Sequence, residues 1–349
     1  MLLLSLSLTN FRNFKEASFE FDSKVTIVLG ENARGKTNIL EAIYFVMNGV
    51  GFRETKEKEL MHWDMNHATV TASFLEAANE LTFRIYLREH EGGSIEKVFF
   101  INKAKKKHVA YSRDIPKAVL FAPEQIAIVT GRPEERRRYL DKMISLYDPE
   151  YRKRVMNYEN ALRKRNKVFE MYRDPVKLEE ELEFWNTYLI EQASYITKKR
   201  EAYIAFLNDH EKVDSVEFSA VYLKNEFTRE RLKGVFELEQ RVRRTMIGPQ
   251  KDDFEMYHQS GKVRKNLHFF GSRSEQRLGV FWLKLNELLM CEEFLKVKPI
   301  LLLDDVFSEL DSKNKKLVFA LISKYQTVIT TTDLDLPSGL GSSKKIIEV

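Results

Sequence analysis

The pattern of apolar and polar residues divides the chain into stretches of different character. Residues 1–29 and 68–101 hold short runs in which apolar and polar side chains alternate, which is the period of a half-buried strand. From Glu134 to about Glu211 the apolar residues recur at helical spacing, with Asp174 and Pro175 as the clear interruption. We therefore expect a β-rich beginning, followed by two long helices packed as a hairpin.

The remainder of the chain contains both predicted helices and predicted strands. The pattern predicts a strand over 216–228, a basic amphipathic helix over 229–247, and later helices over 275–291 and 313–323. Residues 299–306 differ, because an unbroken apolar run ends in two aspartates, as in a strand buried on both faces of a parallel sheet. Together with the strands predicted over 25–29 and 327–331, this run indicates an α/β lobe with a mainly helical insertion.

A loop with the phosphate-binding pattern G-x-x-x-x-G-K-[ST] joins the strand over 25–29 to a helix over 36–48. Glycines let successive N–H groups turn inward around an anion, and the following helix adds the positive end of its dipole. Lys36 is expected to meet the β- and γ-phosphates, and the Thr37 hydroxyl to bind Mg²⁺. A chance turn is the alternative, which the leading strand and the apolar helix face disfavour. The residues expected around the nucleotide are Gly30, Glu31, Asn32, Ala33, Arg34, Gly35, Lys36, Thr37 and Asn38.

Asp304 and Asp305 end the apolar run. In P-loop folds, an aspartate at the carboxyl end of a strand beside the P-loop strand orients Mg²⁺, which assigns Asp304 to the metal together with Thr37. Asp305 is expected next to the γ-phosphate, where it would polarise the attacking water, so Lys36, Asp304 and Asp305 are the catalytic candidates. Acids that cap the next helix are the alternative, but that explanation accounts for one aspartate and not for a pair.

A second anion site is predicted at Ser272, where the segment Gly271–Arg277 opens a helix. A hydroxyl group and free N–H groups would meet there. One subunit has no use for two such sites on a single γ-phosphate unless the second comes from a neighbour. We therefore expect a homodimer in which ATP lies between the P-loop of one copy and Ser272 of the other.

Composition narrows the class of protein. A chain of 349 residues with 43% hydrophobic residues is long enough for one large or two ordinary packed domains. Cys291 is the single cysteine, which excludes an internal disulfide framework and suits a reducing compartment. No apolar run approaches the ~18 residues of a membrane-spanning helix, and the alternating N-terminus indicates a strand rather than a signal peptide. We expect a cytoplasmic protein without a membrane partner.

The net charge of +5 is concentrated in one region. Residues 131–170 contain 12 Lys or Arg and 7 Asp or Glu, so the rest of the chain sums to zero. Such a stretch suits a polyanion such as DNA, and a solvated face of charged helices is the alternative. The tip Lys103–His108 is either a solvated turn or a phosphate contact.

These motifs resemble the ATP-binding-cassette heads of the SMC-like repair ATPases. Gly30–Thr37 matches the P-loop, Ser308–Asp311 the D-loop, and Ser272–Arg277 the signature motif. Within that group the chain is similar to the RecF family in the order and spacing of motifs along nearly its whole length. The matching segments are Asn10–Phe14, Gly30–Asn38, Phe121–Glu124, Gly131–Asp141, Ala161–Asn166, Gly248–Asp253 and Asp304–Asp311.

The resemblance implies an ATPase lobe formed by residues 1–112 with 295–349, and a mainly helical lobe of residues 113–294 that carries the signature motif. It implies ATP and Mg²⁺ as cofactors, Ser272 acting in trans, and Asp311 near the nucleotide. It also implies a weak DNA-dependent ATPase of recombinational repair, associated with the nucleoid, that binds single- and double-stranded DNA at gap junctions. RecR is the implied partner, with RecO and RecA acting indirectly as RecA replaces single-strand-binding protein.

The signature motif departs from the family pattern. Ser274 replaces the usual glycine and Arg273 the usual glutamine, so a side chain there could crowd the γ-phosphate of a partner. Gln125 falls near the Q-loop position, and the switch-loop position falls among Thr330, Thr331 and Thr332. A nucleotide-gated DNA-binding scaffold with negligible hydrolysis is therefore the alternative function. The ATPase subunit of a transporter is a third class, which the basic helical insertion and the motif series disfavour.

Overall fold

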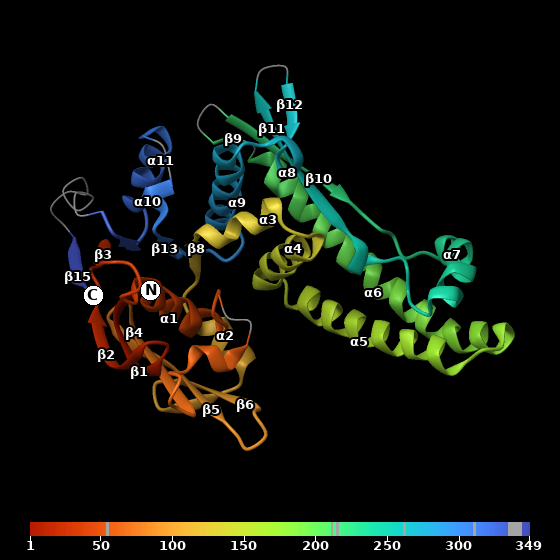
Figure 1. Cartoon of the computed structure of the whole chain (residues 1–349), viewed down its shortest axis with the longest axis horizontal. Coiled ribbons are helices and arrows are strands. Elements are labelled where there is room, and N and C mark those ends of the chain that lie inside the picture. Colours follow the sequence, from red (N-terminus) through yellow and green to blue (C-terminus); the bar gives the residue numbers. More distant parts are fainter. Residues whose placement is uncertain (54–55, 211, 214–215, 261–262, 310–311, 334–343) are drawn as a thin grey trace. The chain divides into compact units, whose positions relative to one another are not determined.

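The computed structural model describes residues 1–53, 56–210, 212–213, 216–260, 263–309, 312–333 and 344–349 (Figure 1). The chain divides into two compact units, one of Met1–Pro123 with Glu287–Val349 and one of Glu124–Asn286. The expected lobe boundaries, 112/113 and 294/295, differ from these by 11 and 8 residues. The first difference arises because β8 (Ala118–Phe121) pairs with β13 (Ile300–Asp304) in the first unit.

The first unit contains two sheets in its described part. A parallel sheet has the strand order β15-β3-β14-β13-β8, and an antiparallel sheet has the order β2-β1-β4-β5-β6-β7. The remaining strands of the parallel sheet are β3 (Val25–Leu29), β14 (Thr327–Thr331) and β15 (Lys345–Glu348). The antiparallel strands are β1 (Leu2–Phe11), β2 (Phe14–Glu20), β4 (His67–Glu76), β5 (Asn79–Glu89), β6 (Ile95–Ile101) and β7 (Ala104–Lys106). The strands predicted over 1–29 and 68–101 are thus confirmed.

Helix α1 (Lys36–Asn48) forms the centre of the core of the first unit. The helical period predicts an apolar face of Ile39, Ala42, Ile43 and Val46, which is too narrow. Leu40, Tyr44 and Phe45 are buried as well. The physical reason is that α1 packs against strands of both sheets, so it has no solvent face over most of its length. It ends at Gly49, whose φ of 74° places it in the left-handed region that glycine adopts without strain. Helices α2 (His108–Asp114), α10 (Val306–Glu309) and α11 (Ser312–Ile322), with the end of α9 (Arg273–Glu293), complete the described α-helices of this unit.

The second unit is mainly helical around a four-stranded sheet of order β12-β11-β10-β9. Residues 133–209 form three helices, α4 (Pro133–Tyr147), α5 (Pro149–Met171) and α6 (Pro175–Asp209), instead of the predicted two. The break that was missed lies at Asp148, whose carboxylate caps α5 at the N–H of Tyr151, with Pro149 as the first helical residue. The other elements are α3 (Ala127–Thr130), β9 (Lys212–Val213), β10 (Val216–Leu223), α7 (Arg229–Val242), β11 (Asp253–Ser260), β12 (Val263–Asn266), α8 (Leu267–Phe270) and the start of α9 (Arg273–Glu293).

Buried ion pairs join the α5–α6 hairpin to the rest of the second unit. Arg200 of α6, which is 3% exposed, donates to the carboxylates of Asp252 and Asp141 at 2.8 Å each. Arg165 of α5, which is 1% exposed, donates to Glu239 of α7 at 2.7 Å. A buried charge is costly unless it is paired, so these contacts fix which surfaces of the helices can face inward. None of the described helices of either unit is long and apolar enough to cross a membrane.

We predict that Glu239→Gln lowers the free energy of unfolding by about 3–5 kcal/mol, because it leaves the buried guanidinium of Arg165 without its carboxylate. The matched control is Glu135→Gln, which breaks the exposed pair with Arg138 and should cost less than about 0.5 kcal/mol. Urea unfolding followed by circular dichroism measures both changes. Equal effects of the two substitutions would contradict the structural role given to the buried pair.

Candidate functional site

The predicted phosphate loop lies between β3 and α1. Ala33 and Gly35 have φ angles of 66° and 109°, both in the left-handed region, and no described side chain caps the N-terminus of α1. The N–H groups at this end of the helix are therefore open to an anion, which the helix dipole also favours. A Cβ atom on Gly35 would lie 2.7 Å from the side-chain amide of Asn13, so both the backbone angle and the surroundings require glycine here.

Lys36 places its ammonium group across this loop. Its Nζ donates hydrogen bonds to the carbonyl oxygens of Gly30 at 2.9 Å and Glu31 at 2.8 Å. Both acceptors are neutral, so the ammonium group keeps a full positive charge with which to attract a phosphate. Residues 31–34 form the exposed rim of the loop, where Glu31 and Arg34 are paired at 3.2 Å.

The residues predicted to bind Mg²⁺ meet beside the loop. The Thr37 hydroxyl donates to Oδ1 of Asp304 at 3.0 Å, and the Thr330 hydroxyl donates to the same oxygen at 2.6 Å. Asp304 is buried at the carboxyl end of β13. Hydroxyl and carboxylate oxygens are the ligands that Mg²⁺ prefers, and two of them lie within hydrogen-bond distance of each other, so the residues present fit this ion.

The expectation that the strand of Asp304 lies directly beside the P-loop strand is wrong. Strand β14 lies between β3 and β13, with Thr330 paired to Val28 on one side and to Asp304 on the other. Thr37 still reaches Asp304 because all three strands are parallel and end at the same edge of the sheet. The sequence placed the correct side chains at this edge but could not give the order of the strands.

Asp305 follows with an unusual backbone. Its φ of 48° is in the left-handed region, and its N–H donates to the hydroxyl and the carbonyl oxygen of Thr330 at 3.0 and 3.2 Å. The Thr330 hydroxyl therefore positions both aspartates, because it donates its proton to Asp304 and accepts a hydrogen bond from the N–H of Asp305. Aspartate tolerates this backbone region better than most residues, and β-branched residues do not. The sequence pointed to residues 330–332 as the switch-loop position but assigned no role to this hydroxyl.

A buried carboxylate that the sequence did not single out lies one turn along α1. Glu41, at 0% exposure, accepts from Arg12 Nε at 2.8 Å and from Arg53 Nη2 at 2.8 Å. Burial raises the pKa of Glu41, but the hydrogen bonds and charges of the two guanidinium groups outweigh it, so its pKa lies below the ordinary value. The sequence signal for this cluster is the segment Asn10–Phe14, which contains Arg12 and resembles the RecF family. No function was assigned to that segment from the sequence.

This cluster borders a hollow next to the P-loop. The hollow has a volume of about 650 Å³, and Asn13 and Asn38, which are bonded to each other at 2.7 Å, line its side nearest the loop. Trp63 is 74% exposed at its edge and stacks on His62 with ring centroids 3.8 Å apart. An exposed indole beside guanidinium groups suits a planar aromatic ligand. No sequence pattern singled out Trp63.

The second predicted anion site is built as a capping box. The N–H of Ser272 donates to the Glu275 carboxylate at 2.7 Å, and the N–H of Glu275 donates back to Oγ of Ser272 at 3.2 Å. The first of these bonds is the main reason that the pKa of Glu275 is lowered. Ser272, Arg273 and Ser274 are exposed, as a contact with a second copy requires. Asp311 and Leu310, in the predicted D-loop, lie outside the described residues.

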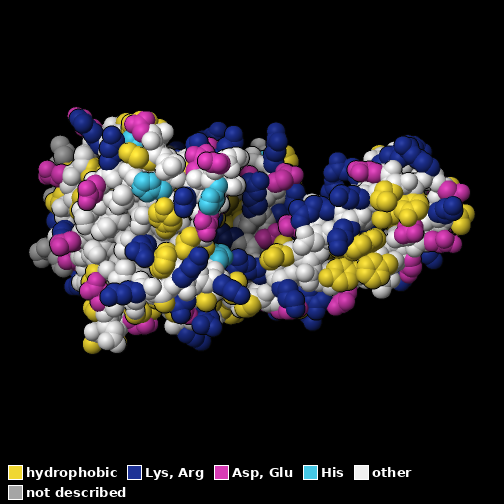
Figure 2. All heavy atoms as spheres, turned by 90° about the horizontal axis from the view of Figure 1, so that it is seen from below, with side chains coloured by type: hydrophobic (Ala, Val, Ile, Leu, Met, Phe, Trp, Pro, Cys, Tyr) yellow, Lys and Arg dark blue, Asp and Glu magenta, His cyan; other side chains and the backbone are white. Residues whose placement is uncertain are grey.

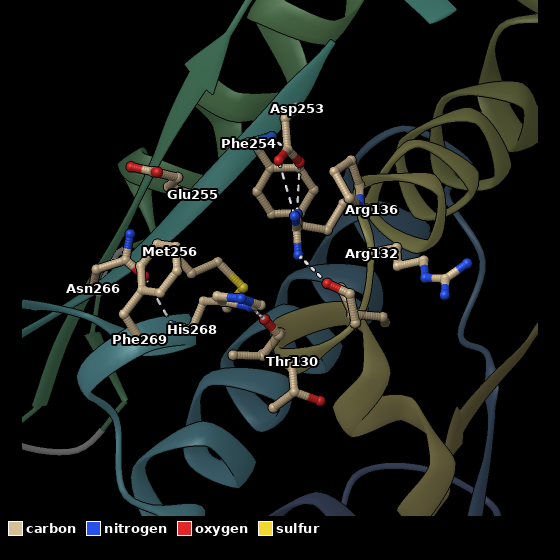
Figure 3. Close-up of a pocket in the computed structure, with 14 residues that line it drawn as sticks. Thr130, Arg132, Arg136, Asp253, Phe254, Glu255, Met256, Asn266, His268 and Phe269 are labelled. Atoms are coloured by element: carbon tan, nitrogen blue, oxygen red, sulfur yellow. Dashed lines mark hydrogen bonds and ion pairs between the residues drawn. The ribbon is translucent and has the colours of Figure 1, made fainter. Parts of the chain in front are cut away.

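A pocket of about 480 Å³ lies within the second unit (Figure 3). Arg136 donates to both carboxylate oxygens of Asp253, at 2.6 and 2.9 Å, and to the carbonyl oxygen of Gly131 at 3.0 Å. On another wall, Nδ1 of His268 donates to the carbonyl oxygen of Val129 at 2.9 Å. These bonds connect the Gly131 segment to β11 and α8, so we read this part of the pocket as support for the chain around it.

Several arginines of the basic stretch 131–170 form ion pairs with carboxylates of the same chain. Arg136 and Arg165 are buried in ion pairs, and Arg154 is paired with Glu150 and Glu191 at 2.6 Å each. The exposed cations on α5 are Arg152, Lys153, Arg163, Lys164 and Lys167. Figure 2 shows that hydrophobic and acidic side chains separate the Lys and Arg side chains on the visible face of this hairpin. The net charge of residues 131–170 therefore overstates the cationic surface that they offer.

Several sequence relatives of the chain share one name. A family model described as the RecF/RecN/SMC N terminal domain matches residues 2–336. A protein of Natranaerobius thermophilus named DNA replication and repair protein RecF is 32% identical over 96% of this chain and 92% of its own length. A protein of the same name from an Exiguobacterium species is 33% identical over 96% of this chain and 93% of its own length.

Solved structures give the same answer for the fold. A structure of the recombination mediator protein RecF with ATP, from the RecFOR pathway, superposes with a TM-score of 0.83 at 29% identity, covering 96% of this chain and 93% of that one. The Smc head domain of Pyrococcus furiosus superposes with a TM-score of 0.54 at 18% identity, covering 100% of this chain and 93% of that one, a likeness of fold alone. The fold is thus the ABC/SMC head type predicted from the sequence, and the chain belongs to the RecF family.

Proposed function

We propose that this protein is a DNA-binding ATPase of recombinational repair, which dimerises when it binds ATP and acts at single-strand gaps. The observation that carries the proposal is the meeting of the P-loop with Thr37, Asp304 and Thr330 at one edge of the parallel sheet. A phosphate loop alone is a common motif, whereas a magnesium-type carboxylate bonded to the P-loop hydroxyl is the arrangement of a nucleoside triphosphatase. The relatives named RecF support the assignment to repair.

The residues of the first unit have separate roles in this proposal. The N–H groups of the loop and the Lys36 ammonium group bind the β- and γ-phosphates, and Asn38 lies at the start of α1 beside them. Thr37 and Asp304 hold Mg²⁺, which neutralises charge on the phosphates when it is bound. Asp305 accepts the proton of the attacking water, and Asp311 completes the nucleotide surroundings. The adenine and ribose occupy the hollow lined by Trp63.

A second copy completes the site through Ser272, whose capping box leaves its hydroxyl proton and the N–H groups of the next two residues for the phosphate. The DNA-contacting candidates are the exposed tip 103–107 and the exposed cations of α5. Hydrolysis would be weak and DNA-dependent. RecR would bind the DNA-bound form, with RecO and RecA acting afterwards. Such a protein would work at the nucleoid in the cytoplasm.

The alternative is a nucleotide-gated scaffold in which hydrolysis is negligible. Its support is Ser274, which is exposed at the position where the family usually has glycine. A dimer-made site should give turnover that rises more than in proportion to protein concentration, because only dimers hold complete sites. A scaffold would dimerise with ATP and show no such turnover. The two functions differ in chemistry and share the same DNA-bound assembly.

We predict that Lys36→Ala weakens ATP binding by about 100-fold or more, because it removes the cation of the phosphate loop. Asp305→Asn should leave ATP binding within about twofold of the parent and lower turnover by about 100-fold, since an amide cannot accept the proton of water. Equilibrium binding of ATP and single-turnover hydrolysis measure the two effects. Equal hydrolysis by the Asp305 variant and the parent would remove the role given to that residue.

We predict that Trp63→Ala weakens the binding of ATP by about 5-fold to 100-fold, because stacking of a base on an aromatic ring is worth about 1–3 kcal/mol. Binding of inorganic triphosphate should stay within about twofold, since the indole lies in the hollow and not in the phosphate loop. Competition experiments with the two ligands make this comparison in one assay. A similar loss for both ligands would mean that the substitution disturbs the loop and that the base lies elsewhere.

We predict that Lys105→Gln combined with Lys106→Gln lowers the salt dependence of DNA binding. The slope of log affinity against log salt should fall by about 0.9 for each phosphate group that the tip no longer neutralises. The matched control, Lys24→Gln combined with Lys198→Gln, removes the same charge from exposed positions outside residues 103–107. Binding to a gapped duplex with ATP across a salt series gives the slopes. An unchanged slope in the tip variant would identify residues 103–107 as a solvated turn.

A further inference from the structure

Two adjacent phenylalanines are exposed directly before the signature motif. Phe269 is 68% exposed and Phe270 is 72% exposed, and their ring centroids lie 6.2 Å apart at the end of α8. Single exposed apolar side chains are common on protein surfaces and need no explanation. Two neighbouring aromatic rings present a larger apolar area to water, which is the composition found at interfaces.

The segment that carries these rings is firmly held. Asn266 caps α8 by accepting from the N–H of His268 at 3.0 Å, and the buried Leu267 anchors the helix in the core. The Gln276 side chain donates to the carbonyl oxygen of Leu267 at 3.0 Å, which connects α8 to the first turn of α9. In Figure 3 the ring of Phe269 lies at the same pocket as Met256 and His268. The two rings are therefore presented on a rigid support, at little entropic cost to a binding partner.

Arg273 is the second unexplained group, three residues after Phe270. It is exposed, and it is the first residue of α9, where the positive end of the helix dipole disfavours a cation. Glu275, the acid of this first turn, does not neutralise the charge of Arg273. Its carboxylate binds the N–H of Ser272, Lys265 at 3.1 Å and His258 at 3.4 Å instead. Within the described residues, the structure shows no ion pair or hydrogen bond from the Arg273 guanidinium group.

Both features match what the ATP-loaded face of another copy would offer. The first unit carries a phosphate loop with Lys36 and, beside it, a hollow with the exposed ring of Trp63, so a bound nucleotide presents negative phosphates next to an aromatic surface. Around Ser272 the second unit offers the complement, an exposed guanidinium group that follows two exposed phenyl rings by three residues in sequence. The complementarity is between two faces of the same chain, so the occupant it favours is a second copy and not an unrelated protein.

We propose that Phe269, Phe270 and Arg273 are the side chains by which one copy closes over the ATP of its twin, with the rings packed on the face around Trp63 and the guanidinium group on the phosphates. This proposal rests on the proposed function, and in particular on the role of Ser272 in trans. The proposal assigns a function to Arg273, which stands where the family usually has glutamine. A guanidinium group supplies a positive charge there, whereas an amide supplies none. The site for ATP is then incomplete in a single chain.

The first experiment is sedimentation velocity with a non-hydrolysable ATP analogue and Mg²⁺. Phe269→Ala combined with Phe270→Ala should raise the dimer dissociation constant by about 30-fold or more, and Arg273→Gln by about 10-fold, because these substitutions remove buried rings and charge-assisted hydrogen bonds from the interface. Analogue binding to the monomer should stay within about twofold. Phe184→Ala and Arg173→Gln remove exposed groups of the same kinds elsewhere and should leave dimerisation unchanged.

The second experiment tests whether Arg273 acts across the interface. Lys36→Ala and Arg273→Gln proteins are assayed alone and as an equal mixture. Each alone lacks complete sites, whereas mixed dimers hold one intact P-loop facing one intact Arg273, so up to about a quarter of the parent turnover should return on mixing. A merely structural role for Arg273 gives no recovery and overturns the proposal.

The outcomes separate this inference from the function it rests on. If the parent protein stays monomeric with the analogue at high concentration, the proposed dimer itself is wrong. If the parent dimerises and the Phe269, Phe270 and Arg273 variants dimerise equally well, the dimer stands and these side chains do not form its interface. Thermal unfolding of each variant at the parent temperature shows that the exposed substitutions leave the fold intact.

Discussion

The contact between the Thr37 hydroxyl and the Asp304 carboxylate is the interaction on which the site depends. The two residues are 267 positions apart in sequence and meet because β3, β14 and β13 run parallel and end together. Both ends of the chain must therefore fold into one sheet before any phosphate site exists. Thr330, from the strand between them, adds a second donor to the same carboxylate oxygen, so the central strand holds the acid and the loop in register.

The second unit uses charge in a different way. Arg136, Arg165 and Arg200 are buried, and each is paired with a carboxylate from a distant segment. The segments around these pairs, such as 131–141, 161–166 and 248–253, are among those that match the RecF family in order and spacing. Their resemblance therefore reflects at least in part the architecture of this unit, since an unpaired buried arginine would be strongly destabilising. The arginines of these motifs are therefore divided, with Arg136 and Arg165 buried and Arg132, Arg138 and Arg163 exposed.

Several features could be predicted from the sequence because local patterns determine them. The phosphate loop, the helix 36–48, the strand 327–331 and the paired aspartates all follow from motif and period. The strand order could not be predicted, because β13 and β14 are both short strands that the sheet buries completely, and either could neighbour β3. The break at Asp148 could have been found, since it shows the same Asp-Pro signal that was recognised at Asp174. The clamp of Glu41 by Arg12 and Arg53 could not have been found from the sequence, because it joins three segments through side chains alone.

The left-handed backbone of Asp305 has an evolutionary consequence. A glycine at this position would relieve the conformational penalty and at the same time delete the carboxylate, whereas most other replacements would strain the turn. Loss of the acid therefore need not carry a loss of fold. Members of such a lineage could drift from hydrolysing nucleotide to merely sensing it through one substitution that the rest of the molecule tolerates.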